Sequence, residues 1–509
     1  MNQARHSTAR AHAPAFRRRV TWAALAVLFI SWGGPAANAF WQTLSSSNFA
    51  AAKADTLPQA GTPAASLGAG VVTVSWGAVT TPGAHSATGY TVARYAAPSG
   101  GTKVAAGGGC AGTVSGLGCT EQSVPDGTWY YTVTPVIALW TGTESARSTA
   151  VAIDTTPPAA SVTSVSPVPN GAGFNSTSPV TVNLAAADPG GSGVASISYR
   201  VDGGSTVTVN TATAAVVVSG NGTHTVSYFA TDAAGNSSQP QAQTVRIDTV
   251  APGIPTISAP ANVNIANVAN VPVTGTAEAG ATVVLTVTDS GAAHTVAQTV
   301  TADGTGAWST SGLGLAGLND GPVGYSAVAK DAAGNASPPA TASSVKDVTA
   351  PAATSITMAN NGGPGQLGRA SSGDTLTIVY SADMNASTVC SGWNNTTATQ
   401  TAPATASISA VNDALTLTSG SCSAPAIGSV VLNGDYNSHT SQARTFAATI
   451  TWTQSTKTLV ITLGDNGTGG TRGDNVPASL PVYTPPAGAA DLAGNPMTGT
   501  STAATASRF

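Results

Sequence analysis

The feature of this 509-residue chain that most restricts its fold is a short proline-containing segment that occurs three times. The three copies begin at Asp154, Asp248 and Asp347, so they lie 94 and 99 residues apart. Proline has no N–H to give to a sheet, and for that reason it is typical of linkers rather than of central strands. A period near 95 residues fits one small two-sheet domain per repeat. The sequence therefore predicts a string of small domains joined by these linkers.

Between the linkers, apolar residues alternate with polar ones at a period of two, which is typical of strands with one buried face. Such runs occupy residues 72–76, 180–184, 197–201, 283–287, 376–380 and 459–463. Turns rich in glycine, asparagine and aspartate separate them, and no helical period exceeds a turn or two. We therefore expect an all-β chain.

The first forty residues have the pattern of a secretory signal. A basic stretch ending at Arg19 precedes an apolar run over 20–32, and Ala37 and Ala39 form an A-x-A cleavage site. The apolar run is too short for a permanent membrane helix, and no second run follows. The predicted mature chain is secreted, extracellular or attached to the surface of a bacterium, without a membrane span.

Charge and cysteine content fit an exported binding protein. Only 8% of residues are charged and the net charge is -4, so no basic face is expected that could bind nucleic acid. The four cysteines form two close pairs, Cys110 with Cys119 and Cys390 with Cys422. In an exported chain these pairs predict two disulfides. No Cys-x-x-Cys and no neighbouring histidine supports a metal site instead.

Several segments resemble known families. The lead segment 40–57, which begins Phe40-Trp41, resembles the start of bacterial proteins processed by a SipW-type signal peptidase. Residues 58–153 resemble a fibronectin type III module through Trp76, Tyr90 and the Tyr131-x-Val133 strand. That resemblance implies that these side chains belong to the core.

The rest of the chain resembles immunoglobulin-like domains. Residues 159–247 and 253–346 are similar to bacterial immunoglobulin-like repeats, since both end in an Asp-Ala-Ala-Gly-Asn phrase. Residues 352–509 resemble surface-layer immunoglobulin-like domains, and they end in a related Asp-Leu-Ala-Gly-Asn phrase. The extra length of this last stretch indicates either an insertion around 390–445 or a domain and a half. Together the resemblances imply tandem immunoglobulin-like and fibronectin type III-like β-sandwiches in an extended chain.

The strongest ligand hypothesis from sequence is calcium. Carboxylate and amide oxygens recur in the linkers and in the closing phrases, and calcium binds such oxygens. The candidate ligands are Asp154, Asp232, Asn236, Asp248, Asp331, Asn335 and Asp347, and the pair Asp491 and Asn495 repeats the pattern. The competing interpretation is that these side chains stabilise their own turns while glycine takes a positive φ.

No catalytic constellation is evident in the sequence. Histidines of the mature chain fall one per predicted domain, at His85, His224, His294 and His439, and neither Gly-x-Ser-x-Gly nor His-Glu-x-x-His occurs. We therefore expect a non-catalytic structural or adhesive protein that binds a protein, a cell envelope or a polysaccharide surface, with no cofactor unless calcium binds. The alternatives are an accessory carbohydrate-binding component, using aromatic rings such as Trp129, Trp140 and Trp393, and a calcium-stiffened adhesin.

Overall fold

The computed structural model describes residues 39–44, 51–363, 365–419, 422, 427–438 and 441–509, and of residues 39–44 and 51–54 it describes the backbone alone. The chain divides into two compact units. The first contains the residues up to Pro158 together with Asp188–Val194 and Thr231–Ser237, and the second contains the remainder. Among the described residues there are four hydrophobic cores, one for each stretch between linkers.

The predicted all-β class is confirmed. Among the described residues the helices are η1 (Gly108–Cys110), η2 (Ser290–Ala292) and α1 (Ala386–Val389), and all other regular elements are strands. None of these helices has the length and apolar character that crossing a bilayer requires. The predicted signal segment, including Ala37, lies outside the described residues. Ala39 begins β1 (Ala39–Leu44), which pairs antiparallel with β2 (Ala51–Thr56).

The first domain has a three-stranded sheet in the order β3-β4-β8 and a second sheet in the order β10-β9-β5-β6, with β7 added to β5 and β11 to β9. Its strands are β3 (Ala64–Gly68), β4 (Val71–Ser75), β5 (Gly89–Tyr95), β6 (Val104–Ala105), β7 (Thr113–Val114), β8 (Gly118–Gln122), β9 (Gly127–Ile137), β10 (Trp140–Thr141) and β11 (Val151–Ile153). The alternation that predicted strands places Val72 and Val74 in the core between the sheets.

The core of the first domain contains the side chains expected from sequence. Trp76 packs on Tyr90 with ring centroids 5.4 Å apart, and Tyr131 is fully buried. The Tyr131 hydroxyl donates to the buried carboxylate of Glu121 at 2.7 Å, and Arg94 forms an ion pair with the same carboxylate. The charge is therefore compensated, as a buried carboxylate requires.

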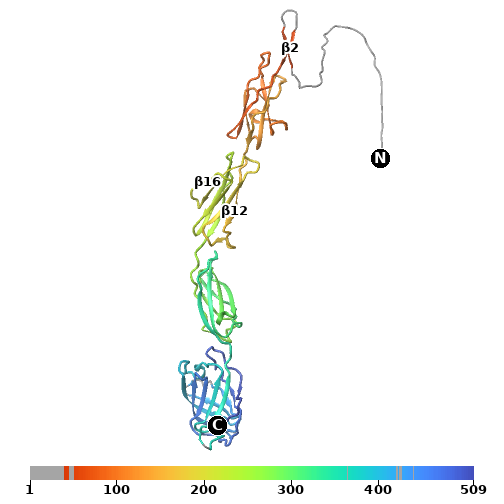
Figure 1. Ribbon diagram of the computed structural model, residues 1–509. Coiled ribbons are helices and arrows are strands. Elements are labelled where there is room, and N and C mark those ends of the chain that lie inside the picture. The colour runs from red at the N-terminus through yellow and green to blue at the C-terminus, as the bar shows by residue number, and fades with distance from the viewer. Residues whose placement is uncertain (1–38, 45–50, 364, 420–421, 423–426, 439–440) are drawn as a thin grey trace, which may run out of the picture. The chain divides into compact units, whose positions relative to one another are not determined.

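The second domain packs the sheet β12-β14-β17 against the sheet β13-β19-β18-β15-β16. The strands are β12 (Ala159–Ser166), β13 (Phe174–Asn175), β14 (Val180–Ala187), β15 (Val194–Val201), β16 (Val207–Val209), β17 (Thr213–Val218), β18 (Gly222–Asp232) and β19 (Gln241–Ile247). Strands β12 and β16 are labelled in Figure 1. Val180, Val182 and Leu184 are buried as predicted, whereas in the 197–201 run Ile197 is buried but Tyr199 is only half-buried.

The third domain has a five-stranded sheet, β20-β26-β25-β22-β23, and a two-stranded sheet, β21-β24. The strands are β20 (Asn262–Val263), β21 (Thr274–Thr276), β22 (Thr282–Asp289), β23 (Thr295–Thr301), β24 (Ala307–Ser309), β25 (Gly321–Lys330) and β26 (Ala340–Lys346). Val283, Leu285 and Val287 of β22 are fully buried, because alternate side chains of a strand point to one face.

The last domain is built from one continuous sheet of nine strands rather than from two separate sheets, in the order β27-β28-β33-β32-β29-β30-β31-β34-β35. The strands are β27 (Ala353–Ala359), β28 (Thr375–Tyr380), β29 (Thr399–Ile408), β30 (Ala414–Thr418), β31 (Ser429–Val431), β32 (Arg444–Thr453), β33 (Thr458–Leu463), β34 (Val482–Thr484) and β35 (Ser501–Thr502). Strand β27 contacts β34 and β35, so the sheet curls around its core. The stretch around 390–445 contributes β29, β30 and β31 to this sheet and supplies residues to the same core.

Both predicted disulfides are formed. Cys110 is bonded to Cys119 over 9 residues of chain in the first domain, and Cys390 to Cys422 over 32 residues in the last. The first joins η1 to β8, and the second joins the end of α1 to the loop after β30. Each crosslink therefore stabilises one domain rather than connecting two.

Candidate functional site: the domain junctions

Each linker is hydrogen bonded to the domain that precedes it. The carboxylate of Asp126 accepts the N–H and the hydroxyl of Thr155 at 2.9 and 2.8 Å, and Asn221 accepts the same two groups of Thr249 at 3.0 and 2.9 Å. Asp320 makes longer contacts of 3.4 Å to the third linker. Each acceptor immediately precedes the glycine that begins β9, β18 or β25, with φ of 135°, 134° and 122°, a conformation that glycine adopts readily.

Each linker is also hydrogen bonded to the closing turn of the domain that follows. In the first case, Asp232 accepts the N–H of Asn236 on Oδ1 and the side-chain Nδ2 of Asn236 on Oδ2, both at 2.8 Å. The same Nδ2 donates to the backbone carbonyl of Asp154 at 3.0 Å. Gly235 lies between the pair with φ of 95°. The turn thus stabilises itself and holds the linker backbone.

This arrangement recurs at the other two linkers. Asn335 donates to the carbonyl of Asp248 at 2.8 Å, and Asn495 donates to the carbonyl of Asp347 at 2.9 Å. The three donors follow their acceptors by 82, 87 and 148 residues. The repeated linkers and the repeated closing phrases, which are distant in sequence, are therefore partners in one recurring joint.

The linker aspartates cap turns as well. In each linker the aspartate Oδ1 accepts the N–H two residues further on, at 3.1 Å for Asp154, 3.0 Å for Asp248 and 2.9 Å for Asp347. Such bonds are typical of aspartate and asparagine in turns. The turn-stabilising role that was weighed against calcium is thus present at all three linkers, and it leaves the second oxygen of each carboxylate for other partners.

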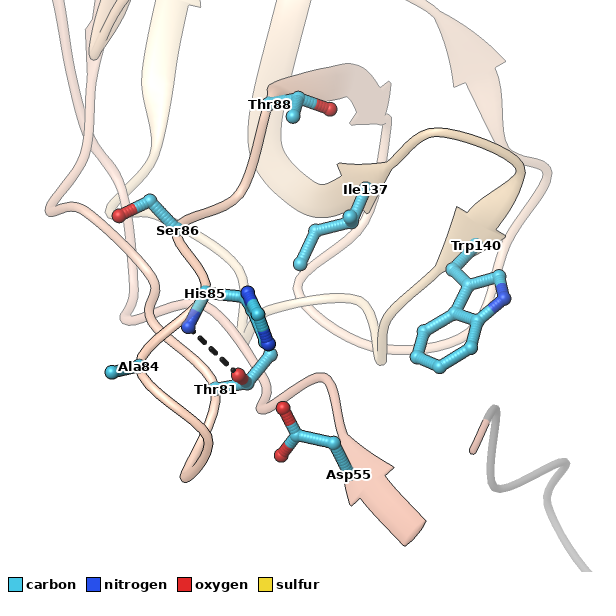
Figure 2. Close-up of a pocket in the computed structure, with 8 residues that line it drawn as sticks. All are labelled: Asp55, Thr81, Ala84, His85, Ser86, Thr88, Ile137 and Trp140. Atoms are coloured by element: carbon cyan, nitrogen blue, oxygen red, sulfur yellow. Dashed lines mark hydrogen bonds between the residues drawn. The ribbon is translucent and has the colours of Figure 1, made fainter. Parts of the chain in front are cut away.

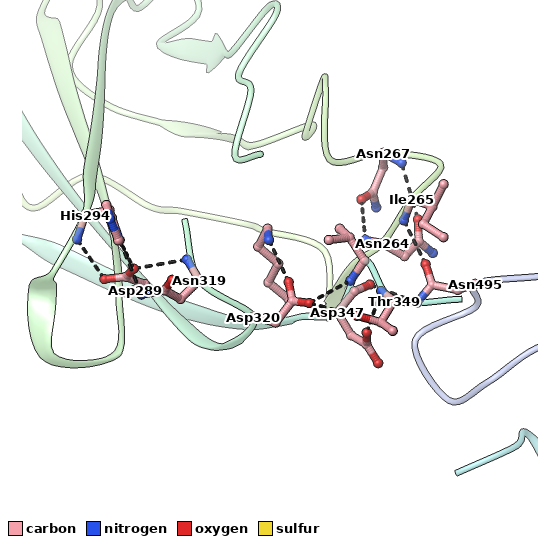
Figure 3. Close-up of polar contacts among 12 residues, drawn as sticks. Asn264, Ile265, Asn267, Asp289, His294, Asn319, Asp320, Asp347, Thr349 and Asn495 are labelled. Atoms are coloured by element: carbon pink, nitrogen blue, oxygen red, sulfur yellow. Dashed lines mark hydrogen bonds and ion pairs between the residues drawn. The ribbon is translucent and has the colours of Figure 1, made fainter. Parts of the chain in front are cut away.

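The third junction carries additional bonds from the loop that follows β20. Asn264 Nδ2 donates to the carbonyl of Ala493 at 2.7 Å, and Ile265 N–H donates to Oδ1 of Asn495 at 2.8 Å. Figure 3 shows Asn264 and Ile265 beside Asn495, with Asp347 and Thr349 next to them. Asn495 has no exposed surface, so its carboxamide is a buried link between linker, closing turn and preceding domain. At the second junction the corresponding contact is a single bond, from Asn170 Nδ2 to the carbonyl of Ala332 at 2.9 Å.

The first junction brings three carboxylates together. One oxygen each of Asp154, Asp188 and Asp232 lies within 4.8 Å of the other two, and this is the one such group of three potential metal ligands found in the described part of the chain. Two oxygens on one calcium ion are separated by at most about twice the 2.3–2.6 Å bond length, so the spacing fits that ion. Of the predicted calcium ligands, the structure therefore groups Asp154 with Asp232.

Sequence reasoning missed Asp188. It follows β14 and begins the loop Asp-Pro-Gly-Gly-Ser-Gly, in which Gly193 N–H donates to its Oδ2 at 2.8 Å. A Cβ on Gly191 would lie 2.3 Å from its Oδ1, so that glycine is what lets the carboxylate fit. The sequence feature that could have identified Asp188 is the glycine content of its loop, which has three glycines within five residues after the aspartate.

The environment of Asp154 favours its ionised form. Hydrogen bonds from Ser192, including its N–H at 2.7 Å to Oδ2, lower the pKa of Asp154. An ionised carboxylate with further carboxyl oxygens beside it is suited to a cation.

A cavity of about 320 Å³ lies in the first domain, between the end of β2 and the β9–β10 turn. Figure 2 shows Asp55, His85, Ile137 and Trp140 around it. Asp55 Oδ1 accepts the N–H groups of Thr56 and Gly83, and the pKa of Asp55 is lowered, chiefly by the neighbouring Thr81 hydroxyl. The oxygen of Ser86, which also lines the cavity, points away from the His85 ring in Figure 2, so these residues do not form a Ser-His-Asp triad.

The other two described histidines each pair with a nearby aspartate. His224 Nδ1 is 2.7 Å from Asp202 Oδ2 and its Nε2 is 3.0 Å from the carbonyl of Gly220. In the third domain, His294 is 2.7 Å from the buried Asp289, as Figure 3 shows. His439 lies outside the described residues.

The tryptophans proposed as a carbohydrate platform do not share one environment. Trp393 is buried in the core of the last domain. Trp129 is partly buried, with the Arg94 guanidinium 4.9 Å from its ring centroid, and Trp140 lines the cavity of Figure 2.

Comparison with known proteins identifies no family. No family model matches the chain, and no curated protein sequence matches it. Solved structures that match include the FN1–FN3 domains of chicken CNTN1, at 16% identity and a TM-score of 0.23, covering 56% of this chain and 99% of that chain.

Two further matches are to a large adhesion protein and to an adhesin. The tetra-tandem repeat from the extending region of a large adhesion protein is 17% identical with a TM-score of 0.26, covering 88% of this chain and 99% of that one. A Ca²⁺-stabilized adhesin of an Antarctic bacterium that binds ice is 18% identical with a TM-score of 0.27, covering 79% and 94%. These scores are too low to assign a function, and the description of the chain as tandem β-sandwiches rests on the sheets and cores above.

Proposed function

We propose that this chain is an exported, non-catalytic structural or adhesive protein, in which tandem β-sandwiches hold binding surfaces away from the point of attachment. The observation that carries this proposal is the recurrence of one joint at all three linkers. At the second linker, for example, Asn221 accepts two hydrogen bonds and Asn335 donates one. With about 1 kcal/mol for each bond, opening that joint costs about 3 kcal/mol, a preference of more than a hundredfold for the bonded geometry.

The distribution of reactive side chains supports a role without catalysis. His85, His224 and His294 lie in three different domains, and two of them pair with a neighbouring aspartate, His224 with Asp202 and His294 with Asp289. A spacer needs repeated, self-stabilising joints and no cleft in which reactive side chains meet. In the described residues the polar groups gather at the joints, as a spacer requires.

Small-angle X-ray scattering of residues 40–509 tests the proposal. An 11-residue strand such as β9 spans about 36 Å at 3.3 Å per residue, so four domains in line would extend roughly 140 Å, with a radius of gyration of about 40 Å. A compact protein of this length would have a radius of gyration of about 23 Å. A value near the compact figure would refute a spacer.

Variants make the same measurement specific to the joints. The double variant Asn221→Ala/Asn335→Ala should lower the radius of gyration, because a loosened joint bends. The control is Asn183→Ala, whose side chain bonds to Ser164 within the second domain. Export is tested separately by sequencing the N-terminus of the protein recovered from culture medium, which should begin at Phe40.

A second proposal is that calcium stiffens the first junction. It is supported by the convergence of Asp154, Asp188 and Asp232 within 4.8 Å and by the lowered pKa of Asp154. Ca²⁺ would replace the repulsion among these carboxylates by ionic bonds, with further oxygens from backbone carbonyls or water.

Thermal unfolding of the mature protein in calcium and in chelator tests this proposal. An ion present at a hundred times its dissociation constant adds about 2.7 kcal/mol to the stability of the native state. The expected rise in melting temperature should disappear in Asp188→Asn and persist in Asp383→Asn, which changes an aspartate in the last domain. Identical curves with calcium and with chelator would reject the calcium proposal and leave the spacer proposal intact.

A further inference from the structure

The outer edge of β17 is an unprotected strand edge in the second domain. Strand β17 ends the sheet β12-β14-β17, and no described strand pairs with its outer side. Its six residues, Thr-Ala-Ala-Val-Val-Val, pair with β14 in an unbroken register from Val180–Val218 to Ala185–Thr213. A strand at a sheet edge presents unpaired N–H and C=O groups to solvent, and these groups can pair with another strand.

The usual devices that block such an edge are absent. There is no aspartate, glutamate, lysine or arginine in the sequence between Asp202 and Asp232. Proline and a bulge are also missing from β17, whereas β12 at the opposite edge has a register shift between Val162 and Ser164. Proteins commonly protect edges with charges, prolines and bulges, so their combined absence leaves the edge of β17 open to pairing.

Two of the three exposed side chains of β17 are apolar as well. Val217 is 59% exposed, and Ala215 beside it on the same face is exposed. The comparable uncharged edge strand of the third domain, β23, is partly covered, because Gln298 donates to the carbonyl of Ser311 at 2.8 Å. Strand β17 thus combines length, β-branched residues, exposure and lack of charge.

We infer that β17 is an assembly site, at which it pairs antiparallel with β17 of a second copy of this chain. Antiparallel pairing of identical strands is self-complementary about a twofold axis, so both copies use the same edge. A twofold axis at Ala215 or at Val216 keeps the buried face of one strand continuous with the buried face of the other, since side chains alternate with a period of two. The two three-stranded sheets would then form one sheet of six strands.

The chemistry of the edge favours a second copy over a charged partner. An uncharged strand has no charged side chain that could attract an acidic or a basic segment. It also has no charge that would repel an identical strand. The net charge of -4 on 509 residues adds little repulsion between copies. The inference goes beyond the proposed spacer function, and its failure would leave the scattering prediction unaffected.

Sedimentation velocity of residues 40–509 over a range of concentrations tests the inference. We expect a reversible dimer, weakened at least about tenfold in Ala215→Lys/Val217→Lys, because twofold pairing brings lysines of the two chains next to each other. The control Ala242→Lys/Thr244→Lys adds the same charge at exposed positions of β19 and should dimerise as the unmodified chain does.

Hydrogen exchange provides the second readout. Amides of β17 should become protected as the concentration of the unmodified protein rises, while amides of the central strand β14 should stay unchanged. A chain that stays monomeric at hundreds of micromolar, a dimer that survives the β17 lysines, or equal loss in both lysine variants would each overturn the inference. Protection of β17 only when an unrelated strand is added would also overturn it and would identify a foreign partner instead.

Discussion

Replacing Asn495 with alanine should destabilise the last domain strongly. Its side chain is fully buried and makes three hydrogen bonds, with Asp491 Oδ2 and the Asp347 carbonyl as acceptors and with Ile265 N–H as donor. Each lost bond costs about 1 kcal/mol, and a buried donor left without a partner adds about 1–3 kcal/mol. The expected loss from three bonds and one unpaired donor is therefore about 4–6 kcal/mol.

The same domain offers a matched control. Asn394 also makes three hydrogen bonds through its Oδ1, to the N–H groups of Thr396 and Thr397 and to the Thr396 hydroxyl, but it is exposed. Water can replace these bonds after truncation, so Asn394→Ala should cost less than about 1 kcal/mol. The pair of variants compares equal numbers of bonds that differ in burial.

Native-state hydrogen exchange measures these losses domain by domain. Peptides from β32 and β33 report the opening free energy of the last domain, and peptides from β14 report a domain that the change does not reach. A drop below about 1 kcal/mol for Asn495→Ala, or one equal to that of Asn394→Ala, would refute the argument that the buried carboxamide holds the joint.

Three further changes have expected outcomes. The hydrogen bond to Asp202 raises the pKa of His224. The stabilisation that protonated His224 gives the folded state is therefore complete below about pH 6.5 and is lost as pH rises through the folded-state pKa. We expect His224→Gln to lower the melting temperature of the second domain at about pH 5.5 but hardly at about pH 8.5. Opening the disulfide between Cys390 and Cys422 by a double serine substitution should cost about 4 kcal/mol in the last domain, from the entropy of a loop of about 32 residues, measured by denaturant unfolding. Tyr131→Phe removes a hydrogen bond to a buried carboxylate and should cost about 1.5–3 kcal/mol in the first domain, measured by hydrogen exchange of β5. A loss below about 0.5 kcal/mol, for this variant or for the double serine variant, would contradict the role assigned to that bond.

The local parts of this structure could be predicted from sequence because they depend on short-range periodicity. Alternating residues such as Leu376 and Ile378 decide which face of a strand is buried, whatever lies opposite. Glycine and asparagine phrases specify turns for a similar reason, since the positive φ at Gly494 and the capping bonds of Asp491 involve residues no more than four positions apart. The two disulfides were predictable because each cysteine has one near partner.

The candidate site depended on contacts that no local pattern specifies. Asp188 joins Asp154 and Asp232 only because the fold brings two loops and a linker together. Likewise, the nine-stranded sheet of the last domain arises from pairing of strands far apart in sequence, such as β28 with β33.

By itself, then, the sequence determined the all-β class, the turns and the two disulfides, since each of these is set within a few residues or by a single available partner. The tertiary structure alone decided that Asn236, Asn335 and Asn495 hold linkers 82, 87 and 148 residues earlier in the chain, and that β17 has an open edge. The physical reason is that a hydrogen-bond donor selects its partner by position in space, and only the packing of whole domains brings these distant groups within bonding distance.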